Sequence, residues 1–89
     1  MIQKRIHFKG DVQGVGFRYT ACRIAGFFAI TGYVKNVPDG SVECVVEGRA
    51  EEIDAFVERL QETMSGYIRQ TTREQHPATG RWHSFGVAR

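Results

Sequence analysis

Residues 6–28 read IHFKGDVQGVGFRYTACRIAGFF, and within this stretch the spacing of the apolar residues changes from two to about 3.6. Before the first glycine the apolar residues share one parity, which predicts a strand over residues 2–9 with one buried face. Three glycines within residues 10–16 predict a loop. From Phe17 onward the apolar residues form one stripe of a helix, so a strand, a loop and a helix are expected in succession.

The rest of the chain continues to alternate between strand and helix patterns. Gly32 is expected to mark the exit from the first helix, with a strand over residues 33–37. The tripeptide Pro38-Asp39-Gly40 is a strong hairpin signal, and a strand over residues 41–47 should follow it. Apolar residues then recur every three or four positions from Ile53 to Met64, which predicts a second helix.

The last third of the chain is more polar. Residues 67–76 lack apolar alternation but contain Thr and Tyr, which favours a strand at the edge of a sheet. A turn at residues 77–80 and a short strand over residues 82–88 complete the chain. The order βαββαβ predicts an α+β, ferredoxin-like sandwich, with one antiparallel sheet, two helices on one face and a short C-terminal strand. With 89 residues, a single domain over residues 1–89 is expected.

Composition narrows the class of protein further. The chain is 42% hydrophobic and 25% charged, as folded globules are, and its net charge of +2 is too small to indicate a nucleic-acid partner. No signal-peptide pattern and no apolar stretch of membrane-spanning length occurs, so no membrane partner is expected. Isolated Cys22 and Cys44 are expected to be buried thiols in the cytoplasm, with a disulfide as the less favoured alternative.

The glycine-rich loop is the best candidate for a binding site. Amide groups at a helix N-terminus lack intrahelical partners, and glycines allow the positive φ angles that turn such amides inward around an anion. Arg18, in the first helical turn, can add a guanidinium to the same anion. Spacing alone leaves two interpretations open, a phosphate site or merely a tight turn between strand and helix.

Other chemistry finds little support in the sequence. Asp39 is interpreted as a turn residue. Nothing in the sequence places a base beside a serine, so no serine nucleophile is expected at Ser41, Ser65 or Ser84. The three histidines, His7, His76 and His83, are not spaced as metal ligands, either with one another or with the cysteines. No metal, no cofactor and no acid–base or covalent machinery is therefore expected.

Two segments resemble the signature motifs of the acylphosphatase family, small enzymes that hydrolyse carboxylic–phosphoric anhydrides. Residues 10–18, GDVQGVGFR, resemble the first motif, and residues 32–40, GYVKNVPDG, resemble the second. Gly48, the second helix and the Thr79-Gly80…Ser84-Phe85 tail extend the resemblance over the whole chain. The family's fold is the ferredoxin-like sandwich predicted above.

The resemblance implies a role for each matching residue. Arg18 matches the arginine that binds the substrate phosphate, and Asn36 matches the asparagine that positions the attacking water. Backbone amides of the loop would hold the phosphate with Arg18, namely those of Val12, Gln13, Gly14, Val15, Gly16 and Phe17. It further implies an acyl phosphate as substrate, inorganic phosphate as product and inhibitor, and no metal or cofactor; we also expect a monomer.

Two alternatives to an enzyme of this family remain. Acylphosphatase-like domains also occur inside larger hydrogenase-maturation proteins, so a non-catalytic anion-binding or interaction module on the same scaffold is the main alternative. An RNA-binding sheet is less favoured, because Glu43 and Glu47 are expected on the outer face of the strand over residues 41–47. The chain departs from the family at Ala29, where a glycine is usual before the second strand, and in its polar residues 69–75.

Overall fold

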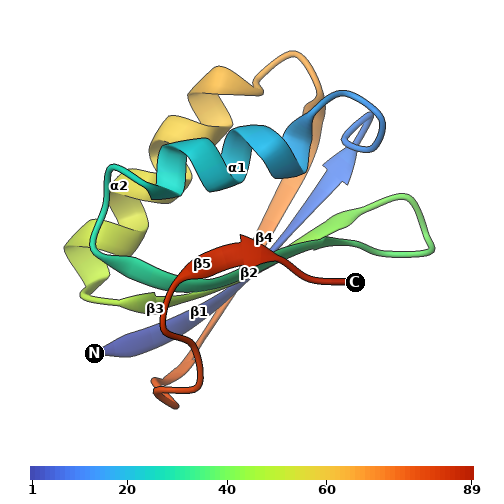
Figure 1. Cartoon of the computed structure of the whole chain (residues 1–89). Coiled ribbons are helices and arrows are strands. Elements are labelled where there is room, and N and C mark those ends of the chain that lie inside the picture. The colour runs from blue at the N-terminus through green and yellow to red at the C-terminus, as the bar shows by residue number, and fades with distance from the viewer.

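A computed structural model describes all residues, Met1–Arg89. Two helices lie on one face of a five-stranded sheet (Figure 1), which confirms the ferredoxin-like fold. The elements in chain order are β1 (Ile2–Gly10), α1 (Phe17–Ala25), β2 (Ile30–Asn36), β3 (Val42–Gly48), α2 (Ala50–Thr63), β4 (Ile68–Pro77) and β5 (Phe85–Val87). Neither helix has the length and apolar composition that crossing a bilayer requires.

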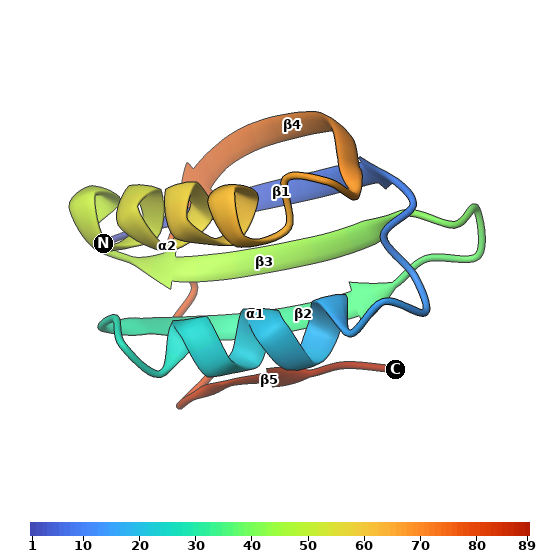
Figure 2. The same cartoon turned by 90° about the horizontal axis from the view of Figure 1, so that it is seen from above.

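The sheet has the strand order β4-β1-β3-β2-β5 and is mixed. β1 pairs antiparallel with β3 and β4, and β2 pairs antiparallel with β3, but β5 pairs parallel with β2. β1 to β4 thus form the predicted antiparallel sheet, and the short C-terminal strand β5, whose orientation was not predicted, adds a parallel edge. The physical reason is the connection from β4, which leaves one edge of the sheet and delivers β5 to the opposite edge (Figure 2).

The polar strand β4 lies at a sheet edge, as predicted. It pairs along nearly the whole length of β1, and the register shifts only between Lys9 and Gly10. Most of its side chains are exposed, because β1 is its only neighbour in the sheet. An edge position explains why this strand tolerates a polar sequence.

The first helix ends earlier than the apolar stripe predicted. α1 stops at Ala25, and Gly32 lies inside β2 rather than at the helix exit. After Ala25 the amides of Phe27 and Phe28 bond the carbonyls three residues before them, which tightens the chain into a turn. Gly32 is needed for space, since a Cβ there would lie 1.8 Å from the carbonyl oxygen of Val45.

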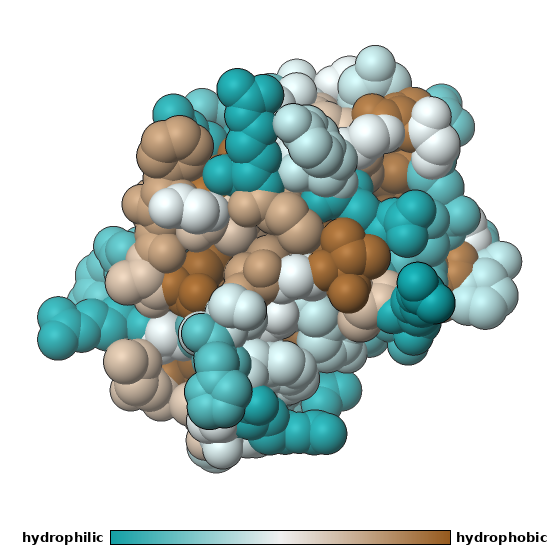
Figure 3. All heavy atoms as spheres, in the orientation of Figure 1, coloured by the Kyte–Doolittle hydropathy of each residue, from teal (hydrophilic) through white to brown (hydrophobic).

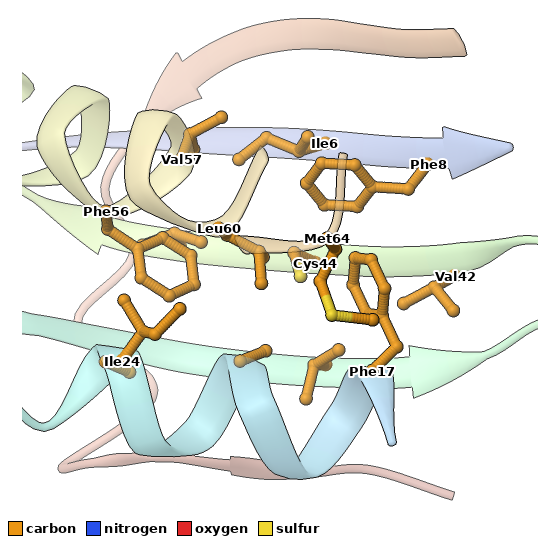
Figure 4. Packing of buried hydrophobic residues seen from close by; sticks show 14 of the residues in the cluster. Ile6, Phe8, Phe17, Ile24, Val42, Cys44, Phe56, Val57, Leu60 and Met64 are labelled. Atoms are coloured by element: carbon orange, nitrogen blue, oxygen red, sulfur yellow. The ribbon is translucent and has the colours of Figure 1, made fainter. Parts of the chain in front are cut away.

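The core lies between the sheet and the two helices (Figure 4). Ile6 and Phe8 of β1 meet Phe56 and Leu60 of α2 in one cluster of 17 buried residues. The rings of Phe8 and Phe17 lie 5.1 Å apart, which joins the end of β1 to the first residue of α1. This contact fixes the two ends of the glycine-rich loop.

The face of the sheet that is turned away from the helices is partly covered. The sequence pattern predicted that this face of the strand over residues 41–47 would be exposed. Val45 and Glu47 of β3 are buried there, because residues 78–84 cross this face between β4 and β5. Trp82, predicted to begin the last strand, instead packs on Tyr33 of β2 at 5.6 Å between ring centroids. The regular strand starts only at Phe85, so the predicted start of the last strand was three residues too early.

Candidate active site

Four elements meet at one end of the sheet. β1, β2 and β5 all run toward this end, because β1 and β2 are both antiparallel to β3 and β5 is parallel to β2. The loop after β1 turns back here into α1, next to the β2–β3 turn (Figure 2). The first helical turn therefore lies beside the last residue of β2.

A pocket of about 440 Å³ opens at this end. It contains residues of the loop, of α1, of the end of β2 and of β5. Its nine lining residues are Val12, Gly14, Gly16, Phe17, Arg18, Tyr19, Cys22, Asn36 and Val87.

The loop presents free amide donors to this pocket. Gly14 and Gly16 both have φ 77°, the left-handed conformation that side chains disfavour, and Gly16 is the N-cap of α1. None of the hydrogen bonds in the structure uses an amide of residues 12–16 as donor. Unused amides at a helix N-terminus attract an anion, since the helix dipole points its positive end the same way.

Arg18 and Asn36 line the same pocket from different elements. Arg18 is exposed, and its side chain makes no ion pair or hydrogen bond with another residue. Asn36 is half-buried at the last position of β2, and its carboxamide also has no partner in the protein. The structure thus brings together two polar side chains 18 positions apart in sequence, both free to bind a ligand.

Gln13 and Val15 do not line the pocket with their side chains. Val15 packs against the core instead. The Gln13 amide donates to the carbonyls of Val37 at 2.7 Å and Ser41 at 2.8 Å. These two carbonyls flank the β2–β3 turn, and Val37 directly follows Asn36. Gln13 therefore ties the glycine-rich loop to the strand end that carries Asn36.

The β2–β3 turn carries a hydrogen-bond chain that corrects one sequence prediction. His7 contacts the hydroxyl of Ser41, so the structure does place a possible base beside this serine. Ser41 is only 3% exposed, however, and its hydroxyl donates to Asp39. Hydrogen bonds from the hydroxyl and the amide of Ser41 lower the pKa of Asp39. Asp39 is thereby confirmed as a turn residue, and the buried hydroxyl is not accessible to a substrate.

Three lining residues were missed by the sequence analysis: Tyr19, Cys22 and Val87. Cys22 lies one helical turn beyond Arg18, a spacing that was available in the sequence. Val87 lies beside Val34 in the parallel β2–β5 pair, and this neighbour could not be predicted from an antiparallel topology. All three count among the five hydrophobic residues of the lining, and none of them carries a charge at neutral pH.

Both cysteines are free, and one differs from its prediction. Cys44 is buried as expected, whereas Cys22 is half-buried in the pocket wall. Burial raises the pKa of both thiols, so both stay protonated at neutral pH. No three His, Cys, Asp or Glu side chains lie together in a way that could hold a metal ion.

Fold and pocket together define a ferredoxin-like domain with free amide donors, an arginine and an asparagine around one hollow. The family model for acylphosphatase matches residues 4–87. The chain belongs to the acylphosphatase family.

Individual relatives support the same family. A Bordetella parapertussis acylphosphatase is 52% identical over 52 residues, which are 58% of this chain and 55% of that protein. The chain thus spans about half the length of the first relatives it matches. A Paenarthrobacter aurescens acylphosphatase is 39% identical over 79 residues, covering 88% of this chain and 84% of the relative.

Solved structures agree in fold. An acylphosphatase from Bacillus subtilis superposes with a TM-score of 0.90 at 31% identity, and each chain is covered completely. HypF of T. kodakarensis matches with a TM-score of 0.85 at 39% identity, covering 99% of this chain but 12% of that much longer one.

Proposed function

We propose that residues 1–89 act as one acylphosphatase domain that hydrolyses acyl phosphates to a carboxylate and inorganic phosphate. One observation carries the proposal: three loop residues with unused amides, Val12, Gly14 and Gly16, line one pocket together with the free side chains of Arg18 and Asn36. Membership of the acylphosphatase family supports an acyl phosphate as substrate.

The loop and Arg18 bind the phosphoryl group in this proposal. Amides of residues 12–17 point their dipoles at the phosphoryl oxygens, and Arg18 adds a charge-assisted bidentate contact. These donors are fixed before substrate arrives, so the charge that develops during transfer is stabilised without rearrangement of the site. Inorganic phosphate fits the same donors and should act as product and competitive inhibitor.

Asn36 positions the water that attacks phosphorus. Its residue lines the same pocket as the loop, and its carboxamide holds the water by proximity and orientation. The water oxygen forms a bond to phosphorus while the bond from phosphorus to the acyl oxygen breaks, and the water's proton passes to a phosphate oxygen. The leaving carboxylate is a weak base, so its departure requires no general acid. A metal or cofactor is not needed by this scheme.

The remaining expectations concern assembly and location. A monomer remains our expectation for the assembly. Two free thiols suit a reducing compartment such as the cytoplasm.

Phosphate release from acetyl phosphate, measured with and without a chelator, tests the proposal. Asn36→Ala should lower the rate about 10²–10³-fold while inorganic phosphate still binds, because only the water loses its partner. Arg18→Lys keeps the charge but loses the planar fork, so phosphate binding should weaken by about 1.5–3 kcal/mol. Arg23→Lys, an exposed arginine of the same helix outside the pocket, is the matched control.

The same experiment separates the proposal from a non-catalytic module. The non-catalytic module is kept as the alternative because of the HypF comparison, in which a similar domain forms a small part of a longer chain. Inorganic phosphate binding without any hydrolysis would support the module. Activity lost in chelator and restored by a divalent ion would refute the metal-free scheme.

A further inference from the structure

The pocket extends beyond the donors that the phosphoryl group needs. Ligand pockets commonly measure about 300–1,000 Å³, and this one of about 440 Å³ has room for a second group beside a phosphate. The extra space runs away from the loop. Cys22 lies one turn further along α1 than Arg18, and Val87 lies beside Val34, two residues before Asn36 on β2.

This far wall is apolar. Five of the nine lining residues are hydrophobic, and Tyr19, Cys22 and Val87 are the three that do not belong to the loop or the buried start of α1. The protonated thiol of Cys22 adds no charge. Arg18 is the single cationic residue of the lining, and in the proposed function it binds the phosphoryl group.

Exposure of the wall is a second, independent observation. The chain exposes five large hydrophobic residues, and two of them, Tyr19 at 72% and Val87 at 51%, line this one pocket. In Figure 3, apolar side chains gather across the middle of the face on which α1 and β5 lie, with hydrophilic side chains around them. Exposed apolar surface beside a polar site is typical of ligand contact.

We propose that Tyr19 and Val87 form an acyl subsite that selects uncharged aromatic or aliphatic acyl groups over acyl groups that carry a second carboxylate. An apolar acyl chain removes both side chains from water when it binds. A second carboxylate placed against this wall meets no free cation, because the only cationic lining residue, Arg18, already binds the phosphoryl group, and it gains nothing from the apolar surface. The inference rests on the proposed acylphosphatase activity and names the substrate class of the same site.

The test compares kcat/KM for acetyl, benzoyl and succinyl phosphate in the wild type and in three variants. Each variant is compared with the wild type on the same substrate, so differences in intrinsic reactivity cancel. Tyr19→Ala and Val87→Asp should lose about tenfold more on benzoyl phosphate than on acetyl phosphate. Val87→Lys should shift the preference toward succinyl phosphate, because it adds a cation to the wall.

Phe27→Ala is the matched control, since Phe27 is 70% exposed near the other end of α1 and does not line the pocket. It should leave kcat/KM unchanged on all three substrates. Inhibition by inorganic phosphate and a thermal melt show whether each variant keeps its fold and its phosphate donors. If Tyr19→Ala and Val87→Asp lost equally on benzoyl and acetyl phosphate, or lost nothing on either substrate, the subsite would be overturned while the activity stayed in place. A wild type that hydrolyses none of the three substrates would overturn the proposed function, and the subsite with it.

Discussion

The carboxylate of Glu47 holds residues 78–84 against the sheet, and Glu47→Gln tests how much this attachment contributes to stability. One oxygen accepts hydrogen bonds from the side chain of Gln3 and from the amide and hydroxyl of Thr79, each at 2.8 Å. The other oxygen accepts from the amide of Gly80 at 2.9 Å. The residue is only 5% exposed, so water replaces none of these bonds readily.

The magnitude follows from the chemistry of the substituted group. A glutamine has one acceptor oxygen, so its NH₂ group must face at least one of these donors, and the negative charge is lost for all of them. Loss of a charge-assisted bond and an unsatisfied buried donor cost about 1.5–3 kcal/mol. For a domain of this size the corresponding fall in Tm is roughly 6–24 °C.

The dependence on pH adds a second signature. Burial acts to raise the pKa of Glu47, but the hydrogen bonds from Thr79, Gln3 and Gly80 outweigh it and lower the pKa below the usual 4.5. A carboxyl whose pKa is lower in the folded state stabilises the fold above its unfolded pKa and loses this contribution as the pH falls through the folded pKa. The stability difference between wild type and Glu47→Gln should therefore be full at neutral pH and shrink below about pH 4.5.

Urea unfolding at several pH values, followed by circular dichroism, measures both effects. Glu58→Gln serves as control, because Glu58 is exposed on α2 and makes no ion pair or hydrogen bond through its side chain. A loss in Glu47→Gln as small as in the control, or a difference between wild type and variant that stays constant down to pH 3, would refute the reasoning.

Three further perturbations have clear expected outcomes. Phe56→Ala removes a ring that is fully buried between sheet and helices, so urea unfolding should report a loss of about 3–5 kcal/mol. Gln13→Met keeps the side-chain length but removes both donors to the β2–β3 turn, so kcat should fall more than phosphate affinity does; equal effects on both would contradict the positioning role. Gly16→Ala forces a side chain into the left-handed conformation at the N-cap, and phosphate inhibition should weaken while thermal unfolding shows a strain cost of about 1–2 kcal/mol.

Local patterns in the sequence predicted most of the fold. Period two before Gly10 and period 3.6 after Phe17 and Ile53 arise from backbone geometry, which each segment carries by itself. The hairpin at Pro38–Gly40 and the polar edge strand were likewise predicted from local chemistry. The resemblance to the acylphosphatase motifs pointed to Arg18 and Asn36, and the structure brings both to one pocket.

Contacts between distant segments decided what the sequence left open. The place of Gly32 inside β2 depends on its close approach to Val45 of β3, which no local pattern encodes. The burial of Glu47 depends on residues 78–84, which cross the sheet. The alternation of β3 alone therefore predicted, wrongly, that Glu47 is exposed.

The outer wall of the pocket depends on the same connection. β5 reaches the edge beside β2 and pairs parallel to it, which places Val87 next to Val34 and across from Cys22. The sequence by itself therefore determined the strands, the helices and the candidate donors for an anion, since each arises from neighbouring residues. Tertiary structure alone decided which side chains stand around those donors, because a parallel pairing between segments more than 50 residues apart is set by the packing of the whole sheet.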